Sequence, residues 1–216
     1  MRRCCAVLFA IVGLGALLAG CGGSGKKTAS DKTSFEQRER ALQAKLRELI
    51  HLRGRLLKTN DVAGFRPAGA RRPFGYDAAS WLEALEIPQR ERAREAQRLK
   101  QLGFQGGVEE RLRPIKRSTA EEGISLIEQF PSNGAPRAEL AAQVQVAKGN
   151  GANEFPVSGI PGARGFGEPG AVNVAFADGR YYYLVGVAYP PGSRPVASQG
   201  DVIRAAKRLF TRLHQA

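Results

Sequence analysis

Two apolar runs that meet at Asp178-Gly179 constrain the fold of this chain more than any other feature. Asp-Gly is one of the strongest short signals for a two-residue β-hairpin turn, in which both central residues take positive φ. If these two residues form the turn, pairing runs outward symmetrically and Phe176 faces Tyr181. We therefore expect an antiparallel hairpin over residues 171–189.

The two faces of this hairpin differ, because side chains alternate along a strand. One face is bulky and apolar and carries Val172, Val174, Phe176, Tyr181, Tyr183, Val185, Val187 and Tyr189. The other is lighter, with small residues beside Tyr182 and Leu184. The last segment has an apolar stripe that suits the bulky face: Val202, Ala206, Leu209 and Leu213. The pattern predicts an α+β fold, an antiparallel sheet centred on the 171–189 hairpin with helices packed on it, plus an N-terminal amphipathic helix.

Helical periodicity and capping residues place the other elements. We expect an amphipathic helix over 34–58, whose stripe comprises Leu42, Leu46, Leu49, Ile50, Leu56 and Leu57. Further helices are expected from Asp77 to about Leu85, from Pro88 to Gly103, from Pro136 to near Gly149, and after Ser198. Strands are expected within 104–113, with a bulge, and over 123–130. Residues 60–75 and 148–170 are expected to be loops, the second with one short strand at 155–157.

The beginning of the chain is typical of an export signal, which has a basic start and an apolar run. Two arginines precede an uncharged run over residues 4–25, whose apolar part is followed by Leu-Ala-Gly-Cys at residues 18–21. This tetrapeptide resembles the lipobox of bacterial lipoproteins. The resemblance implies cleavage between Gly20 and Cys21, and lipidation of Cys21 with a diacylglyceryl group and acyl chains such as palmitate. The alternative is an uncleaved membrane anchor, since about 20 apolar residues can span a bilayer.

The lipobox interpretation divides the chain into four parts. Residues 1–20 are a signal peptide, 21–33 the lipidated cysteine with a flexible tether, 34–58 the amphipathic helix, and 59–216 the α+β domain. Cys4 and Cys5 leave with the signal, so the exported domain has neither a free thiol nor a disulfide. We therefore expect the protein to be attached to the extracytoplasmic face of the cell membrane by its lipid anchor.

The formal net charge of +13 makes anionic partners worth considering. The arginines are dispersed among glutamates, so nucleic acid is not expected, whereas anionic lipid or an envelope polymer stays open as a partner beside the membrane itself. His51 and His214 lack neighbours at metal-ligand spacing. The sequence therefore predicts neither a metal site nor a cofactor.

Catalytic signals are sparse in this sequence. It contains no G-x-S-x-G motif, and its two histidines lie at poor places for a general base. Two carboxylate pairs, Glu109-Glu110 and Glu121-Glu122, are expected to face solvent at strand edges. We therefore expect that the protein is not an enzyme.

The leading functional hypothesis is a lipid-anchored, extracytoplasmic binding or sensor-like domain. Trp81, Phe155, Phe166 and Tyr182 are the aromatic side chains expected at a ligand rim. The order of leader, hairpin and final helix is loosely similar to small actinobacterial lipoproteins and sensor domains of PsbP/Mog1-like type, and this likeness transfers no functional residues. The alternatives are a structural envelope accessory and an unrecognised envelope hydrolase. A concave apolar pocket would favour binding, and perturbed carboxylates that converge in a cleft would favour hydrolysis.

Overall fold

The structure, a computed structural model, describes residues 29–69, 74–115, 121–193 and 195–215. The leader, the lipobox at 18–21 and most of the tether lie outside the described residues. The chain divides into two compact units at Glu39 and Arg40, and the fold below is that of the second unit, 40–216.

Eight strands of the described chain form one antiparallel sheet in the order β1-β3-β4-β8-β7-β6-β5, with β2 also paired to β3. Their bounds are β1 Phe65–Pro67, β2 Phe74–Gly75, β3 Gly106–Pro114, β4 Glu122–Gln129, β5 Asn153–Pro156, β6 Arg164–Glu168, β7 Ala171–Asp178 and β8 Tyr181–Ala188. The 171–189 hairpin supplies β7 and β8, which lie in the interior of the sheet. The predicted α+β class is confirmed.

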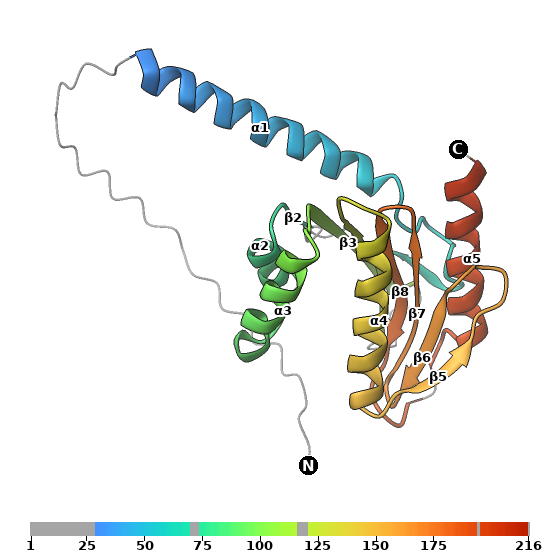
Figure 1. The fold of residues 1–216 in the computed structure, drawn as a ribbon. Coiled ribbons are helices and arrows are strands. Elements are labelled where there is room, and N and C mark those ends of the chain that lie inside the picture. The colour runs from blue at the N-terminus through green and yellow to red at the C-terminus, as the bar shows by residue number, and fades with distance from the viewer. Residues whose placement is uncertain (1–28, 70–73, 116–120, 194, 216) are drawn as a thin grey trace, which may run out of the picture. The chain divides into compact units, whose positions relative to one another are not determined.

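Helices cover both faces of this sheet, as Figure 1 shows for α4 and α5. The helices are α1 Ala29–Arg53, α2 Ala78–Ala84, α3 Gln89–Gln101, α4 Gly134–Gly149 and α5 Gln199–Gln215. The first core lies between α5 and the bulky face of the hairpin, where Phe176 stacks on Tyr183 at 4.8 Å between ring centroids. The second core lies between α2, α3 and α4 and the lighter face, and it includes Trp81 and Tyr182. Within the described residues, no helix has both the length and the apolar character that a membrane span requires.

The hairpin has the expected faces, but the predicted pairing is wrong by two residues. Asp178 pairs with Tyr181, so the turn residues are Gly179 and Arg180, and Phe176 faces Tyr183 instead of Tyr181. Gly179 has a φ of 55°. A type II′ turn places glycine at its first central position, whereas the prediction assumed type I′ over Asp178-Gly179. A shift of two residues preserves the alternation, so each side chain keeps its face.

The N-terminal helix ends at Arg53, five residues before the predicted end at Lys58. Tight turns follow, in which the N–H of Gly54 donates to the carbonyl of His51. Leu56 and Leu57 therefore leave the helix and are buried in the first core, while Ile50, which was expected in the apolar stripe, is exposed. The side chains of Leu42, Leu46 and Leu49 lie outside the described residues.

The two segments predicted as loops contain strands. Residues 60–75 supply β1 and β2, which pair with β3, and 148–170 supplies the β5–β6 hairpin at one edge of the sheet. The ring of Phe155 lies over Gly165, where a Cβ atom would come within 2.0 Å of it. This cross-strand aromatic–glycine pair stabilises a hairpin too short for a clear alternating pattern. The expected bulge within 104–113 is also wrong, because β3 pairs with β4 in continuous register from Gly106 to Leu112.

The helix boundaries that depend on local capping are close to those predicted. Asp77 caps α2 through a bond from the N–H of Ser80 to its Oδ1 at 2.8 Å. Ser198 and Asp201 form the capping box of α5. Helix α4 begins at Gly134, two residues before the predicted Pro136, and the side chain of Asn133 before it makes no capping hydrogen bond with the described residues. Capping groups act within one turn, which is why sequence spacing locates these ends.

Candidate functional site

Glu128 lies on β4 in phase with Ile124 and Leu126, so its side chain points into the second core. Trp81 of α2 lies flat over Gly107 of β3, where an added Cβ would approach the indole ring to 2.7 Å. This close approach places the indole N–H 2.7 Å from Oε1 of Glu128, to which it donates a hydrogen bond. Gly107 thus leaves room for the indole ring of Trp81, and the indole N–H holds the carboxyl group of Glu128 in position.

A second buried carboxyl group, Glu139 of α4, is fully enclosed in the same region. The guanidinium of Arg98, on α3, pairs with Oε2 of Glu139 and also with Glu95, at 2.5 Å. The side-chain amide of Gln143 donates to Oε1 of Glu139 at 2.8 Å. Both oxygens of Glu139 are therefore satisfied. By contrast, Oε2 of Glu128 is buried and has no hydrogen-bond partner among the described residues.

A cavity of about 300 Å³ borders Glu128, between the sheet and helices α2, α3 and α4. Its walls are largely apolar and include Leu82, Leu85, Ile87, Ile124, Leu126 and Leu184. Tyr182, Arg98 and Glu95 contribute polar groups. We call this cavity the Glu128 pocket. Apolar walls with a few convergent polar groups are typical of small-molecule sites, and the volume lies at the lower end of their range.

The electrostatics of the Glu128 pocket favour the neutral form of Glu128. Burial raises the pKa of Glu128 to about 8, and repulsion by Glu139 adds to the rise, against the opposing effects of Trp81 and Arg98. Burial also raises the pKa of Glu139, which Arg98 counteracts. At neutral pH Glu128 therefore holds its proton. Since Oε1 accepts the indole N–H, the proton is held on Oε2, which becomes an O–H donor without an acceptor.

The tyrosine beside this donor is also neutral. Burial raises the pKa of Tyr182 well above its ordinary value, and Glu139 and Glu128 raise it further. Three charged groups shift the pKa of Glu128: Arg98 and Glu95, which lie on α3, and Glu139, which lies on α4. The pocket therefore offers a ligand an apolar surface, one strong neutral donor and a phenol, beside the ion pair of Arg98 and Glu95.

Carboxyl groups with shifted pKa values that converge in a cleft would favour a hydrolase, so the positions of these groups relative to the pocket bear on catalysis. Two-carboxylate hydrolysis requires both groups to face the scissile bond. Of Glu128 and Glu139, only Glu128 borders the pocket, while Glu139 is held behind it by Arg98 and Gln143. Burial also raises the pKa of Glu109, which lines the pocket from β3, but Glu109 is engaged by Arg111, which donates a hydrogen bond to it at 2.8 Å. The described residues contain no group of three His, Cys, Asp or Glu side chains that could hold a metal ion. This geometry suits recognition of a ligand better than a two-carboxylate reaction.

The four aromatic residues expected at a ligand rim do not form one rim. Tyr182 lines the Glu128 pocket, and Trp81 is fully buried behind Glu128. Phe155 packs against the first core and Phe166 against the second. Cys21 and Gly20 lie outside the described residues.

The residues that sequence reasoning missed are Glu128, Glu139 and Arg98. Glu128 could have been recognised from the sequence, because it occupies a core-facing position in the predicted 123–130 strand, in phase with Ile124 and Leu126. A lone carboxyl group at such a position is a candidate for a shifted pKa. Glu139 and Arg98 lie on helices whose partners depend on tertiary packing.

Glu109, Glu110 and Glu121 were expected to face solvent, and this prediction is wrong because all three are buried. Strand β3 is not an edge strand, since β1 and β2 pair with it on the side away from β4. Glu109 accepts a hydrogen bond from Arg111 at 2.8 Å, and Glu121 accepts one from the N–H of Val196 at 2.6 Å. Only Glu122, of the four, is exposed.

The fold and its pocket define an α+β domain with one antiparallel sheet between two layers of helices. No protein-family model and no curated protein matches the chain. Among solved structures, the chain is similar to the extracellular domain of PknH from Mycobacterium tuberculosis, with 11% sequence identity and a TM-score of 0.46. The alignment covers 76% of this chain and 94% of that one.

Proposed function

We propose that the protein is a lipid-anchored, extracytoplasmic binding domain that takes a small, mostly apolar ligand into the Glu128 pocket without catalysing a reaction. The observation that carries this proposal is the unpaired, buried Oε2 of Glu128 beside an apolar cavity. An unpaired polar group in an apolar site costs free energy, and a ligand that pairs with it recovers that cost on binding.

The chemistry of the pocket specifies the polar group of the ligand. A protonated carboxyl group whose carbonyl oxygen already accepts from Trp81 has an O–H left to donate. The complementary group is a hydrogen-bond acceptor such as a ketone or amide oxygen. We therefore assign the ligand to the class of small apolar molecules that carry one carbonyl group.

The proposed location rests on the lipobox at 18–21 and on the Gly, Ser and Lys-rich tether that follows it. Two or more acyl chains on Cys21 would suffice for stable anchoring. We expect mass spectrometry of the native protein to find a chain that begins at Cys21 and carries acyl groups. Recovery of the intact, unacylated chain from membranes would contradict the anchor but would leave the pocket proposal in place.

Ligand binding is expected to weaken as pH rises through the pKa of Glu128. We choose 4-phenyl-2-butanone as the probe and n-butylbenzene as its hydrocarbon match, with the full chain on phosphatidylcholine vesicles. The fluorescence of Trp81, the one tryptophan of the chain, reports binding next to Glu128. Because only the protonated carboxyl group donates, the affinity for the ketone should fall by up to about tenfold per pH unit above pH 8, until it reaches the affinity that remains without the donor.

Two variants separate this hydrogen bond from simple partitioning. Glu128→Gln keeps a donor without a titration, so it should bind the ketone with an affinity independent of pH. Glu128→Met removes the donor and should bind the ketone more weakly than the hydrocarbon, because the carbonyl group then loses its water without gaining a partner. A ratio of ketone affinity to hydrocarbon affinity that is the same in the unaltered protein and in Glu128→Met, or ketone binding that does not change between pH 6 and pH 10, would contradict the proposed role of Glu128.

A further inference from the structure

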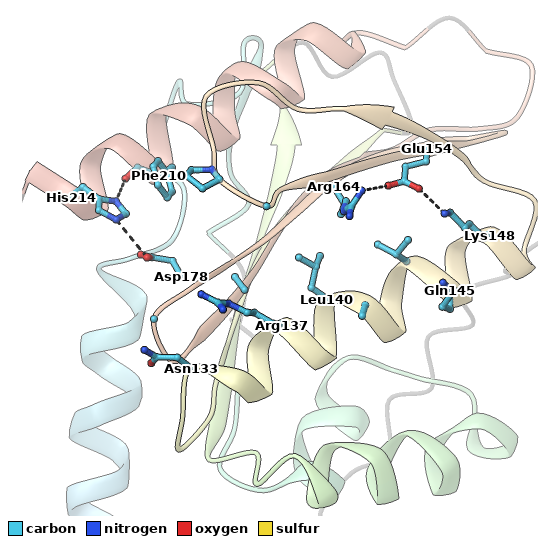
Figure 2. A pocket seen from close by; sticks show the side chains of 16 residues that line it. Asn133, Arg137, Leu140, Gln145, Lys148, Glu154, Arg164, Asp178, Phe210 and His214 are labelled. Carbon is cyan, nitrogen blue, oxygen red and sulfur yellow. Dashed lines mark hydrogen bonds and ion pairs between the residues drawn. The ribbon is translucent and has the colours of Figure 1, made fainter.

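A second hollow lies on the other flank of α4 and shares no lining residue with the Glu128 pocket. It is a groove of about 650 Å³ between α4, β6 with the turn before it, the tip of the β7–β8 hairpin and the last turns of α5. Figure 2 shows this groove, with α4 along one side and the side chains of Arg164 and Glu154 near one end. His214 and Asp178 lie near the other end (Figure 2). We call it the α4 groove.

The α4 groove has an excess of basic side chains in its lining, with Arg137, Lys148 and Arg164 against Glu154 and Asp178. Glu154 is shared by two cations, with Lys148 at 2.7 Å and Arg164 at 3.0 Å, so these two together exceed the charge of their partner. Arg137 is exposed on α4, and none of the acidic side chains in the described ranges lies within ion-pairing distance of it. The arginine is thus a free guanidinium that points into a concave surface (Figure 2).

The remaining lining of the α4 groove is apolar. Leu140, Ala141 and Val144 of α4 contribute one wall, and Pro161 and Phe210 contribute the opposite side. Phe210 is held in place by an edge-to-face contact with Phe176 in the first core, at 5.8 Å between centroids. A fixed aromatic ring and aliphatic side chains can bury the body of an organic molecule, while a guanidinium binds a carboxylate or sulfonate in a bidentate manner.

We infer that the α4 groove binds an organic anion with an apolar body, whose acidic group pairs with Arg137. The combination of one unpaired arginine with excess charge at Lys148 and Arg164 selects an anion over a neutral or cationic molecule. The apolar walls select an amphiphilic anion over a small inorganic one. Three cations interrupted by Glu154 and Asp178 make a poor surface for a polyanion such as nucleic acid, which requires an extended run of positive charge.

The test uses naphthalene-2-sulfonate as the probe and 2-naphthalenemethanol as its neutral match. Calorimetric titration of the full chain on phosphatidylcholine vesicles, with empty vesicles as the blank, measures both affinities. We expect the sulfonate to bind more tightly than the alcohol, with an affinity that falls in 0.5 M NaCl because partly exposed ion pairs are screened.

Three variants assign this binding to the groove. Arg137→Gln should weaken sulfonate binding about tenfold, as loss of a charge-assisted hydrogen bond predicts. Arg113→Gln, at an exposed position on β3 outside the groove, is the matched control and should bind as the unaltered protein does. Glu154→Gln releases Lys148 and Arg164 and should strengthen binding about threefold.

Three results would overturn binding of an organic anion in the α4 groove. Equal affinities for Arg137→Gln and Arg113→Gln would overturn it, as would equal binding of the sulfonate and the alcohol, or a lack of sulfonate binding by the unaltered protein. Because Glu128→Met leaves the α4 groove intact, sulfonate binding should survive in that variant. This outcome distinguishes the α4 groove from the Glu128 pocket.

Discussion

Glu128→Gln is expected to gain stability relative to the unaltered protein by about 1.4 kcal/mol for each pH unit between pH 4.5 and pH 8. The native state holds the Glu128 proton up to its pKa of about 8, whereas the unfolded chain releases it near 4.5. Within this window the native state binds more protons than the unfolded state. The unaltered protein therefore loses stability as pH rises through the window, and the glutamine variant does not.

Urea denaturation at pH 4.5, 6, 7.5 and 9, followed by the fluorescence of Trp81, measures this difference. Glu83→Gln, at an exposed position on α2, is the matched control and should stay within about 0.5 kcal/mol of the unaltered protein. The advantage of Glu128→Gln should level off above pH 8, where both states of the unaltered protein are ionised. A constant difference from pH 4.5 to 9 would show that Glu128 titrates alike in the folded and unfolded chain.

Arg98→Met is expected to destabilise the protein by about 3–5 kcal/mol near pH 8. The substitution removes the cation that pairs with Glu139, a carboxyl group with no exposed surface, and leaves the amide of Gln143 as its remaining side-chain partner. Removal of one partner of a buried pair leaves an uncompensated charge. The loss should shrink in acid, because burial raises the pKa of Glu139 and the protonated form needs no cation.

The double variant Arg98→Met/Glu139→Leu should recover most of this loss, since two apolar residues can replace a buried ion pair. Arg94→Met is the matched control on the same helix: its guanidinium is 75% exposed and pairs with Glu95, so the change should cost no more than about 1 kcal/mol. Chemical denaturation at pH 5 and pH 8 gives the free energy of unfolding of the unaltered protein and of the three variants at each pH. A double variant no more stable than Arg98→Met alone would contradict the assignment of the loss to Glu139.

The parts of the fold that the sequence predicted correctly depend on short-range patterns. The β7–β8 faces, the stripe of α5 and the cap at Asp77 each arise within one strand or one helical turn. The pairing within the hairpin was predicted wrongly because the positive φ of a glycine suits both type I′ and type II′ turns. The prediction assumed type I′ with Gly179 as the second central residue, whereas Gly179 is the first central residue of a type II′ turn.

The candidate sites were harder to predict, because their members come from separate elements. The Glu128 pocket joins β4, α2, α3 and α4, and both Arg98 and the Glu139 behind it occupy ordinary helix positions in the sequence. Glu109 and Glu110 were misplaced since β1 and β2 are too short to be recognised, and without them β3 is taken for an edge. The phase of Glu128 on β4 was the one local clue to the pocket.

Strand β8 carries Tyr182 and Tyr183 in succession, and each anchors a different core. A single amino acid inserted between them would exchange the destinations of every side chain on one half of the strand, placing valines among carboxyl groups and glycine against α5. The two cores therefore depend on one strand register, and an insertion within β8 would disrupt both of them at once.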